Sequence, residues 1–339
     1  MYEQTRVLDV HGHVSHPMAG MGQAFMFMVS MNGKLPSNVR AGSEAASAMG
    51  LGPEEFAVST GRHVGLMDDR GIEMQVIGPR PFLMNGGSVQ PHVLPHWTRL
   101  VNDSIHTQCE MYPDRFIGAA QLPQRAGEDD ATHMLDEATR CVDELGFQGI
   151  YVSPDPEGRR NSPGMADPYW NPLYAFCEER GLPVIVHGTN CLDPRFEPVP
   201  HNYQLGFVAE QYWANQILSH SDVFERFTGL KVIICHCGGA LDRWIATDPH
   251  LSQKDLSDNL FYDTCAHDET YLATAIKQRT PERMCFGSEV PGSGSALREN
   301  GRPADDLVPV IGGYDFLTEA DKTLIFNENP KRLFSGFGN

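Results

Sequence analysis

The feature that most constrains the fold is a series of eight short apolar runs that alternate with segments of helical pattern. The runs are rich in Val, Ile and Phe and show little polar alternation, which is typical of strands buried on both faces of a parallel sheet. They span residues 6–10, 73–78, 115–121, 147–153, 182–188, 231–237, 260–265 and 283–289. Eight such strands with helices between them predict an α/β fold, a distorted (β/α)8 TIM barrel.

The intervening segments carry the helical pattern, and three of them end near a glycine, as helices often do. The clearest are residues 96–113, 131–146, 171–181 and 222–230. A doubly wound open sheet is the alternative architecture. It would usually place a glycine-rich phosphate loop after the first strand, and the sequence has no such loop there.

The chain of 339 residues suits one domain, residues 1–339, with two long additions. Residues 15–65 follow the first strand and are rich in Met, Gly, Ser and Ala, so we interpret them as an insertion that forms a lid. Residues 290–312 follow the eighth strand, and loops of that length are more often functional than idle.

The amino-acid composition limits the classes of molecule that the protein is expected to bind. A formal net charge of −18 and a pI near 5.1 argue against nucleic acid and anionic membranes. No apolar run reaches the 18 residues of a membrane span, and the first residues lack the apolar core of a signal peptide. Several of the eight cysteines lie in apolar runs, and all eight are interpreted as reduced thiols of a cytoplasmic protein. We therefore expect a small-molecule substrate. If that substrate is an anion, its binding site must supply positive charge locally, from a metal ion or an arginine, because the protein as a whole is negative.

Polar residues gather where the predicted strands end. Because the carboxyl ends of barrel strands build the active site, these residues are the candidates for chemistry. They are His11 and His13 after strand 1, Arg80 after strand 2, His187 after strand 5, His236 after strand 6 and Glu289 after strand 8.

Imidazole and carboxylate are ligands for a divalent ion such as zinc, with manganese or iron as alternatives. We expect His11, His13, His187 and Glu289 to bind it, with Gly12 allowing a tight curl between the first two. Such an ion lowers the pKa of bound water. The remaining His236 is then a candidate for proton transfer. Each histidine alone is more often structural, so the prediction depends on the whole set.

Four phrases of the sequence resemble those of a known superfamily. The phrases VLDVHGH (7–13), PVIVHG (183–188), VIICHCGG (232–239) and CFGSE (285–289) occur in the order found in the amidohydrolase superfamily. The chain resembles its aminocarboxymuconate semialdehyde decarboxylase branch most. That resemblance implies a distorted barrel, usually one zinc or similar ion, and frequent homodimers. It also implies that His11, His13 and His187 are ligands and that His236 is catalytic.

Glu289 stands where most of that branch has aspartate. A glutamate there resembles the 4-oxalomesaconate hydratases and the zinc-dependent meta-cleavage-product hydrolases, as does VIGPRPFLM (76–84), whose arginine faces an anionic substrate. Arg80 is therefore predicted to bind substrate. Tyr203 is predicted to bind substrate as well, because the loop after strand 5 can reach the barrel mouth. Glu289 is predicted to act in catalysis as well as in metal binding.

The predicted function is a metal-dependent hydrolase or hydratase that adds water to a small oxo-carboxylate from aromatic catabolism, with carbon–carbon bond hydrolysis favoured. A nonoxidative decarboxylase in the same barrel is the first alternative. A barrel without a metal, or without catalysis, is the second.

Overall fold

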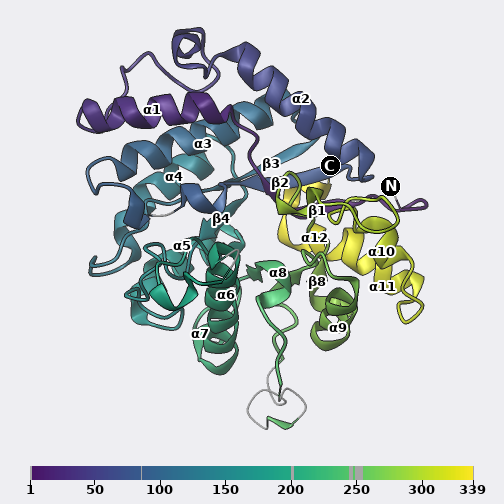
Figure 1. Ribbon diagram of the computed structural model, residues 1–339. Coiled ribbons are helices and arrows are strands. Elements are labelled where there is room, and N and C mark those ends of the chain that lie inside the picture. The colour runs from purple at the N-terminus through teal and green to yellow at the C-terminus, as the bar shows by residue number, and fades with distance from the viewer. Residues whose placement is uncertain (1, 85, 200–201, 244–246, 249–254, 339) are drawn as a thin grey trace.

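The structure is a computed structural model, and it describes residues 2–84, 86–199, 202–243, 247–248 and 255–338. Eight parallel strands form one sheet in which each strand pairs with the next along the chain. Helices surround the strands (Figure 1). The strands are β1 (Leu8–His13), β2 (Met74–Gly78), β3 (Phe116–Ala120), β4 (Gly149–Val152), β5 (Val184–Val186), β6 (Val232–Ile234), β7 (Leu260–Asp263) and β8 (Met284–Cys285). Strands β2 to β8 lie within the predicted apolar runs, and β1 overlaps its run and extends beyond it. The predicted (β/α)8 barrel is therefore confirmed.

Backbone hydrogen bonds join the first strand to the segment around the last one. The Val10 amide donates to the Phe286 carbonyl at 2.9 Å, and the Glu289 amide donates to the His11 carbonyl at 2.8 Å. The second bond lies beyond the end of β8. It places Glu289 next to the histidines of β1, although 278 positions separate Glu289 from His11 in the sequence.

The helices occupy the positions between the strands and after β8. They are α1 (Met18–Ser30), α2 (Pro53–Asp69), α3 (Leu94–Met111), α4 (Leu135–Asp143), α5 (Asn171–Arg180), α6 (Asn202–His220), α7 (Val223–Arg226), α8 (Cys235–Gly238), α9 (Glu269–Arg279), α10 (Val308–Gly312), α11 (Glu319–Thr323) and α12 (Asn329–Leu333). The predicted helix over 222–230 is only the single turn α7. The predicted helix over 131–146 starts with a 3-10 turn before α4.

Two apolar cores flank the strands. Alternate strand residues such as Leu8, Val10 and Ile185 point into the barrel, while their neighbours pack against the helices. Inside, they meet three residues from the carboxyl end of the chain, Leu333, Phe334 and Phe337. Side chains thus fill the interior of the barrel. Only at the carboxyl ends of the strands are side chains free to form a site.

The segment predicted to be a lid contains α1 and most of α2. It contacts α3, and its His63 also contacts Gln75 on β2 and Phe116 on β3. The Phe25 and Trp97 rings lie 5.2 Å apart, edge to face, and the Thr107 hydroxyl donates to the Ala41 carbonyl at 3.0 Å. Its role as a lid stays a prediction. Among the described residues, none of the helices combines the length and the apolar character that crossing a membrane requires.

The expectation of a tight curl at Gly12 is wrong. Strand β1 continues through His13, with an irregularity of register between Asp9 and Gly12. Gly12 is needed for a different reason, because a Cβ atom there would lie 2.2 Å from Cδ of Gln75. The Gln75 side chain crosses the strand at this point, donates to Asp9 at 2.8 Å and lies 2.8 Å from Nε2 of His63.

Candidate metal centre

Four histidines converge at the carboxyl ends of three strands. His11 and His13 lie on β1, His187 lies directly after β5, and His236 lies in α8, two residues after the end of β6. The ring centres of His11 lie 5.1 Å from those of His187 and His236, and the last two lie 4.9 Å apart. The structure therefore brings together the histidines that the strand ends and the family resemblance predict as site residues.

A hydrogen bond at Nδ1 fixes the ring of each of the first three histidines. His11 donates to Asp263 at 2.6 Å, His13 to the Pro79 carbonyl at 2.9 Å and His187 to the Gly188 carbonyl at 2.7 Å. A proton on Nδ1 leaves the lone pair on Nε2. Those three Nε2 atoms are buried and have no hydrogen-bond partner among the described residues.

His236 is held differently. The Gln211 amide nitrogen lies 3.0 Å from its Nδ1 and donates to it, so the neutral ring carries its proton on Nε2. The backbone is left-handed at His236 (φ 53°) and again at Cys237 (φ 57°). This uncommon conformation turns the ring toward the other histidines. A proton on Nε2 is compatible with a part for His236 in proton transfer, and that part stays a prediction.

Glu289 also has a left-handed backbone (φ 62°), and its side chain is almost fully buried. Its Oε1 lies 3.7 Å from Nε2 of His13 and 3.8 Å from Nε2 of His236. Burial raises the pKa of this carboxyl, but the facing histidines outweigh burial and hold the pKa well below its usual value. A carboxylate anion thus lies among the histidines.

The electrostatics of the histidines follow from burial and from their neighbours. Burial opposes charge at His11, yet the facing Asp263 carboxylate raises the pKa of that imidazole. Burial lowers the pKa of His13 to about 4 and that of His187 well below its usual value. Neutral imidazoles are the form that binds a metal.

The donors fit a divalent cation. His11, His187, His236 and Glu289 each offer one ligand atom within 4.8 Å of the others. The 3.7 Å between His13 and Glu289 is too long for a hydrogen bond and slightly wider than the roughly 3.3–3.6 Å between ligands bonded at 2.0–2.2 Å to a tetrahedral ion. Imidazole with carboxylate suits zinc, manganese or iron. In this group His236 stands in place of the predicted ligand His13, although the sequence predicted His236 only as a catalytic residue.

Arg80 lies close to this cluster. Its Nε donates to the Val14 carbonyl at 3.2 Å. Burial lowers the pKa of its guanidinium, and the negative charge of Glu289 opposes that shift. His16 lies within range of the Arg80 charge, and both of its ring nitrogens are buried without a hydrogen-bond partner among the described residues. The side chain of Tyr203 lies outside what the structure describes, and its backbone belongs to α6.

Sequence reasoning missed Asp263, Cys265 and His267. Asp263 orients His11, while His267 Nε2 lies 3.7 Å from Oε2 of Glu289. A signal was present, because Asp263 and Cys265 end the apolar run LFYDTC, where the same strand-end rule applies. A cavity of about 210 Å³ opens beside Glu289. It is lined by Phe207, Val208, His236, Cys265, His267 and Tyr271, among others.

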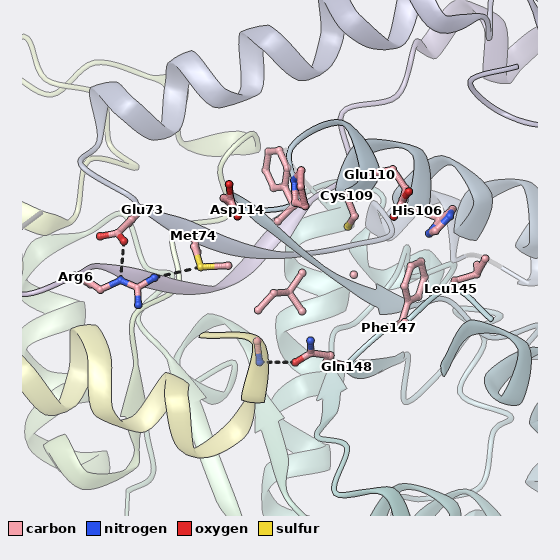
Figure 2. Close-up of a pocket in the computed structure, with 16 residues that line it drawn as sticks. Arg6, Glu73, Met74, His106, Cys109, Glu110, Asp114, Leu145, Phe147 and Gln148 are labelled. Atoms are coloured by element: carbon pink, nitrogen blue, oxygen red, sulfur yellow. Dashed lines mark hydrogen bonds and ion pairs between the residues drawn. The ribbon is translucent and has the colours of Figure 1, made fainter. Parts of the chain in front are cut away.

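A larger cavity, about 510 Å³, lies at the opposite end of the barrel (Figure 2). It is lined by residues at the amino ends of β2 and β3, such as Met74 and Phe116, and Arg6 pairs with Glu73 at one edge of it at 2.6 Å. The four histidines lie at the carboxyl ends. The chemistry of the molecule is therefore expected in the smaller cavity.

Comparisons with known proteins agree with this geometry. A family model described as Amidohydrolase matches residues 8–336. The chain is 28% identical over 279 residues to a 2-keto-4-carboxy-3-hexenedioate hydratase of Sphingobium, covering 79% of this chain and 80% of that protein.

Solved structures share the fold. A 4-oxalomesaconate hydratase from Rhodopseudomonas palustris superposes with a TM-score of 0.79 at 23% identity, covering 98% of this chain and 96% of the other. A dihydroxybenzoic acid decarboxylase from Polaromonas with bound manganese has a TM-score of 0.64 at 20% identity, covering 98% and 97%. With a family match over nearly its whole length, this chain is a member of the amidohydrolase family and an enzyme of the amidohydrolase superfamily.

Proposed function

We propose that this protein is a metal-dependent hydratase that adds water to a conjugated carbon–carbon double bond of a small oxo-polycarboxylate. The substrate class is a ring-fission product of aromatic catabolism. One observation carries the proposal: the buried Glu289 carboxylate faces Nε2 of His13 at 3.7 Å, and the Nε2 atoms of His11, His13 and His187 have no hydrogen-bond partner among the described residues.

The relatives favour hydration over the hydrolysis that the sequence had favoured. The Sphingobium relative is named a hydratase, and so is the structure from Rhodopseudomonas palustris. Carbon–carbon bond hydrolysis needs the same water and the same residues, so it differs from hydration only in the bond that reacts. Zinc is the proposed ion, with manganese or iron as alternatives.

Each residue has a separate part in the proposed reaction. When bound, the divalent cation acts as a Lewis acid and supplies a more acidic water. The Arg80 guanidinium binds a substrate carboxylate, for which its planar fork is suited. His236 holds a proton at Nε2, which Gln211 fixes by donating to Nδ1, and transfers it during the addition. Tyr203 is proposed to donate a hydrogen bond to developing negative charge.

The test uses the metal-loaded protein and 2-keto-4-carboxy-3-hexenedioate. Hydration removes the conjugated double bond, so we expect the ultraviolet absorbance of the substrate to fall and ¹⁸O from labelled water to appear in the product. Activity should disappear on chelation and return with added metal. Cleavage into two fragments would instead identify hydrolysis.

Decarboxylation is the competing function, because the Polaromonas decarboxylase shares the fold and binds manganese. It predicts carbon dioxide in a one-to-one ratio with turnover, whereas hydration releases none. Release of carbon dioxide from an aromatic acid such as dihydroxybenzoate, with no reaction of the unsaturated oxo-acid, would overturn the proposed hydratase.

A further inference from the structure

We propose that Cys265, His267 and the second carboxylate oxygen of Glu289 form a further cation subsite, so that Glu289 bridges two metal ions. This inference rests on the proposed metal centre, because Glu289 belongs to both sites. It adds a ligand set in which imidazole and carboxylate are joined by a thiol.

The two oxygens of Glu289 face different donors. Oε1 lies near Nε2 of His13 and of His236, at 3.7 and 3.8 Å. Oε2 lies 3.7 Å from Nε2 of His267 and 3.8 Å from Sγ of Cys265. The ligand atoms of the second trio all lie within 4.8 Å of one another. One carboxylate therefore has a pair of donors on each side.

The spacing of the second trio is close to that of ligands around an ion, and slightly wider. The 3.7 Å between His267 and Glu289 exceeds hydrogen-bond length. A tetrahedral ion with bonds of about 2.0 Å to nitrogen and oxygen and 2.3 Å to sulfur separates such ligands by roughly 3.3–3.6 Å. In the present arrangement the Cys265 thiol points at Oε2 as a weak donor. A bound cation takes the place of that thiol proton, which leaves to solvent.

The surroundings provide both support and access. The backbone amide of Cys265 donates to Asp263 at 3.0 Å, and Asp263 also holds His11, so one carboxylate positions a donor of each site. Cys265 and Glu289 are buried, while the His267 side chain is 29% exposed and lines the 210 Å³ cavity. An ion can therefore enter from that cavity.

The ligand types indicate which ion the subsite would take. Thiolate with imidazole selects zinc or cobalt over magnesium or calcium. A second cation there would add positive charge along the cavity and would attract a polyanionic substrate.

Cobalt is the probe, because a thiolate bound to Co²⁺ produces a charge-transfer absorption in the near ultraviolet. The apoprotein is titrated with Co²⁺ alone, and absorbance and bound metal are measured. We expect two equivalents per chain and the thiolate band to grow with one of them. Cys265→Ser should remove the band and one equivalent but leave the other. His267→Gln should weaken the same equivalent at least tenfold and serves as the second variant if Cys265→Ser fails to fold.

Two further thiols provide controls. Cys177 lies buried in α5, so Cys177→Ser should change neither the band nor the stoichiometry. Cys235 lies in a separate group with His11 and Asp263, and a band that disappears only in Cys235→Ser would overturn the proposal. So would one equivalent without a thiolate band in the native sequence, an outcome that leaves the main centre intact. If no cobalt bound at all, both the subsite and the metal-dependent function would be wrong.

Discussion

Asp263 and His11 form a fully buried pair in which Oδ2 of the carboxylate accepts a 2.6 Å hydrogen bond from Nδ1 of the imidazole. The histidine keeps the pKa of Asp263 below its usual value despite burial, so Asp263 is a carboxylate that faces the Nδ1–H group of His11. Asp263 also accepts from the amides of Cys237 and Cys265. A single carboxylate from β7 therefore orients a candidate ligand on β1 and fixes the loops after β6 and β7.

Replacing Asp263 with Asn should weaken metal binding by about ten- to a hundredfold, the usual cost of losing a carboxylate behind a histidine ligand. Asn retains the size of the side chain but removes the charge that stabilises the Nδ1–H tautomer. Competition with a chromogenic chelator measures the affinity. Asp258→Asn is the matched control, because Asp258 is an exposed partner of Arg332. Equal affinities of the Asp263 variant and the native protein would contradict the role of this pair.

Replacing Arg80 with Ala should lower kcat/KM on an oxo-polycarboxylate by about ten- to a hundredfold, since a charge-assisted hydrogen bond is worth about 1.5–3 kcal/mol. The loss should appear mainly in KM if the guanidinium only binds the substrate. Arg80→Lys retains the charge without the planar fork and should recover part of the loss. Steady-state kinetics measure both variants. Arg62, exposed on α2, supplies the control Arg62→Ala. Unchanged kinetics for Arg80→Ala would exclude a substrate-binding role.

The eight strands were predictable because a strand covered on both faces by other elements must be apolar along its whole length. Because active-site residues follow the carboxyl ends of barrel strands, the sequence alone then predicted His11, His13, His187, His236 and Glu289 as site residues. Their convergence follows from topology alone, since parallel strands of one barrel all end at the same rim.

What the sequence did not reveal depends on contacts between distant segments. Asp263 is one acidic residue among 44, and only its position opposite Nδ1 of His11 distinguishes it. The predicted curl at Gly12 was wrong, because the need for glycine comes from the Gln75 side chain on β2, which leaves no room for a Cβ atom. His16 and His267 follow no apolar strand directly, so no local pattern marked them.

The pH dependence of stability should carry a contribution from Glu210. Burial, and then the charge of Asp155, raises its pKa from 4.5 to about 7, although Arg160 opposes the shift. Between those values the folded protein holds a proton that the unfolded chain has lost. This contribution to the free energy of unfolding therefore falls as the pH rises from about 4.5 to 7 and stays low above that.

Glu210→Gln cannot titrate, so the variant should be more stable than the native protein at pH 8, and the difference should shrink toward pH 5. Urea unfolding at a series of pH values measures this. Glu179→Gln, an exposed change on α5, should leave the pH profile unaltered. A Glu210→Gln profile parallel to that of the native protein would mean that this carboxyl is not perturbed.

Gly12→Ala tests the close approach of β1 and Gln75. The new Cβ would lie 2.2 Å from Cδ of Gln75, and that side chain is held by Asp9 and His63, so it cannot move without breaking buried hydrogen bonds. Overpacking of this kind costs about 1–3 kcal/mol of unfolding free energy. Gly22→Ala is the matched control: its Cβ would meet nothing within 4 Å in α1, and alanine is favoured in a helix by about 0.5–1 kcal/mol. Urea unfolding should therefore move in opposite directions for the two variants. A Gly12→Ala protein as stable as the native one would show that β1 and Gln75 have room to separate.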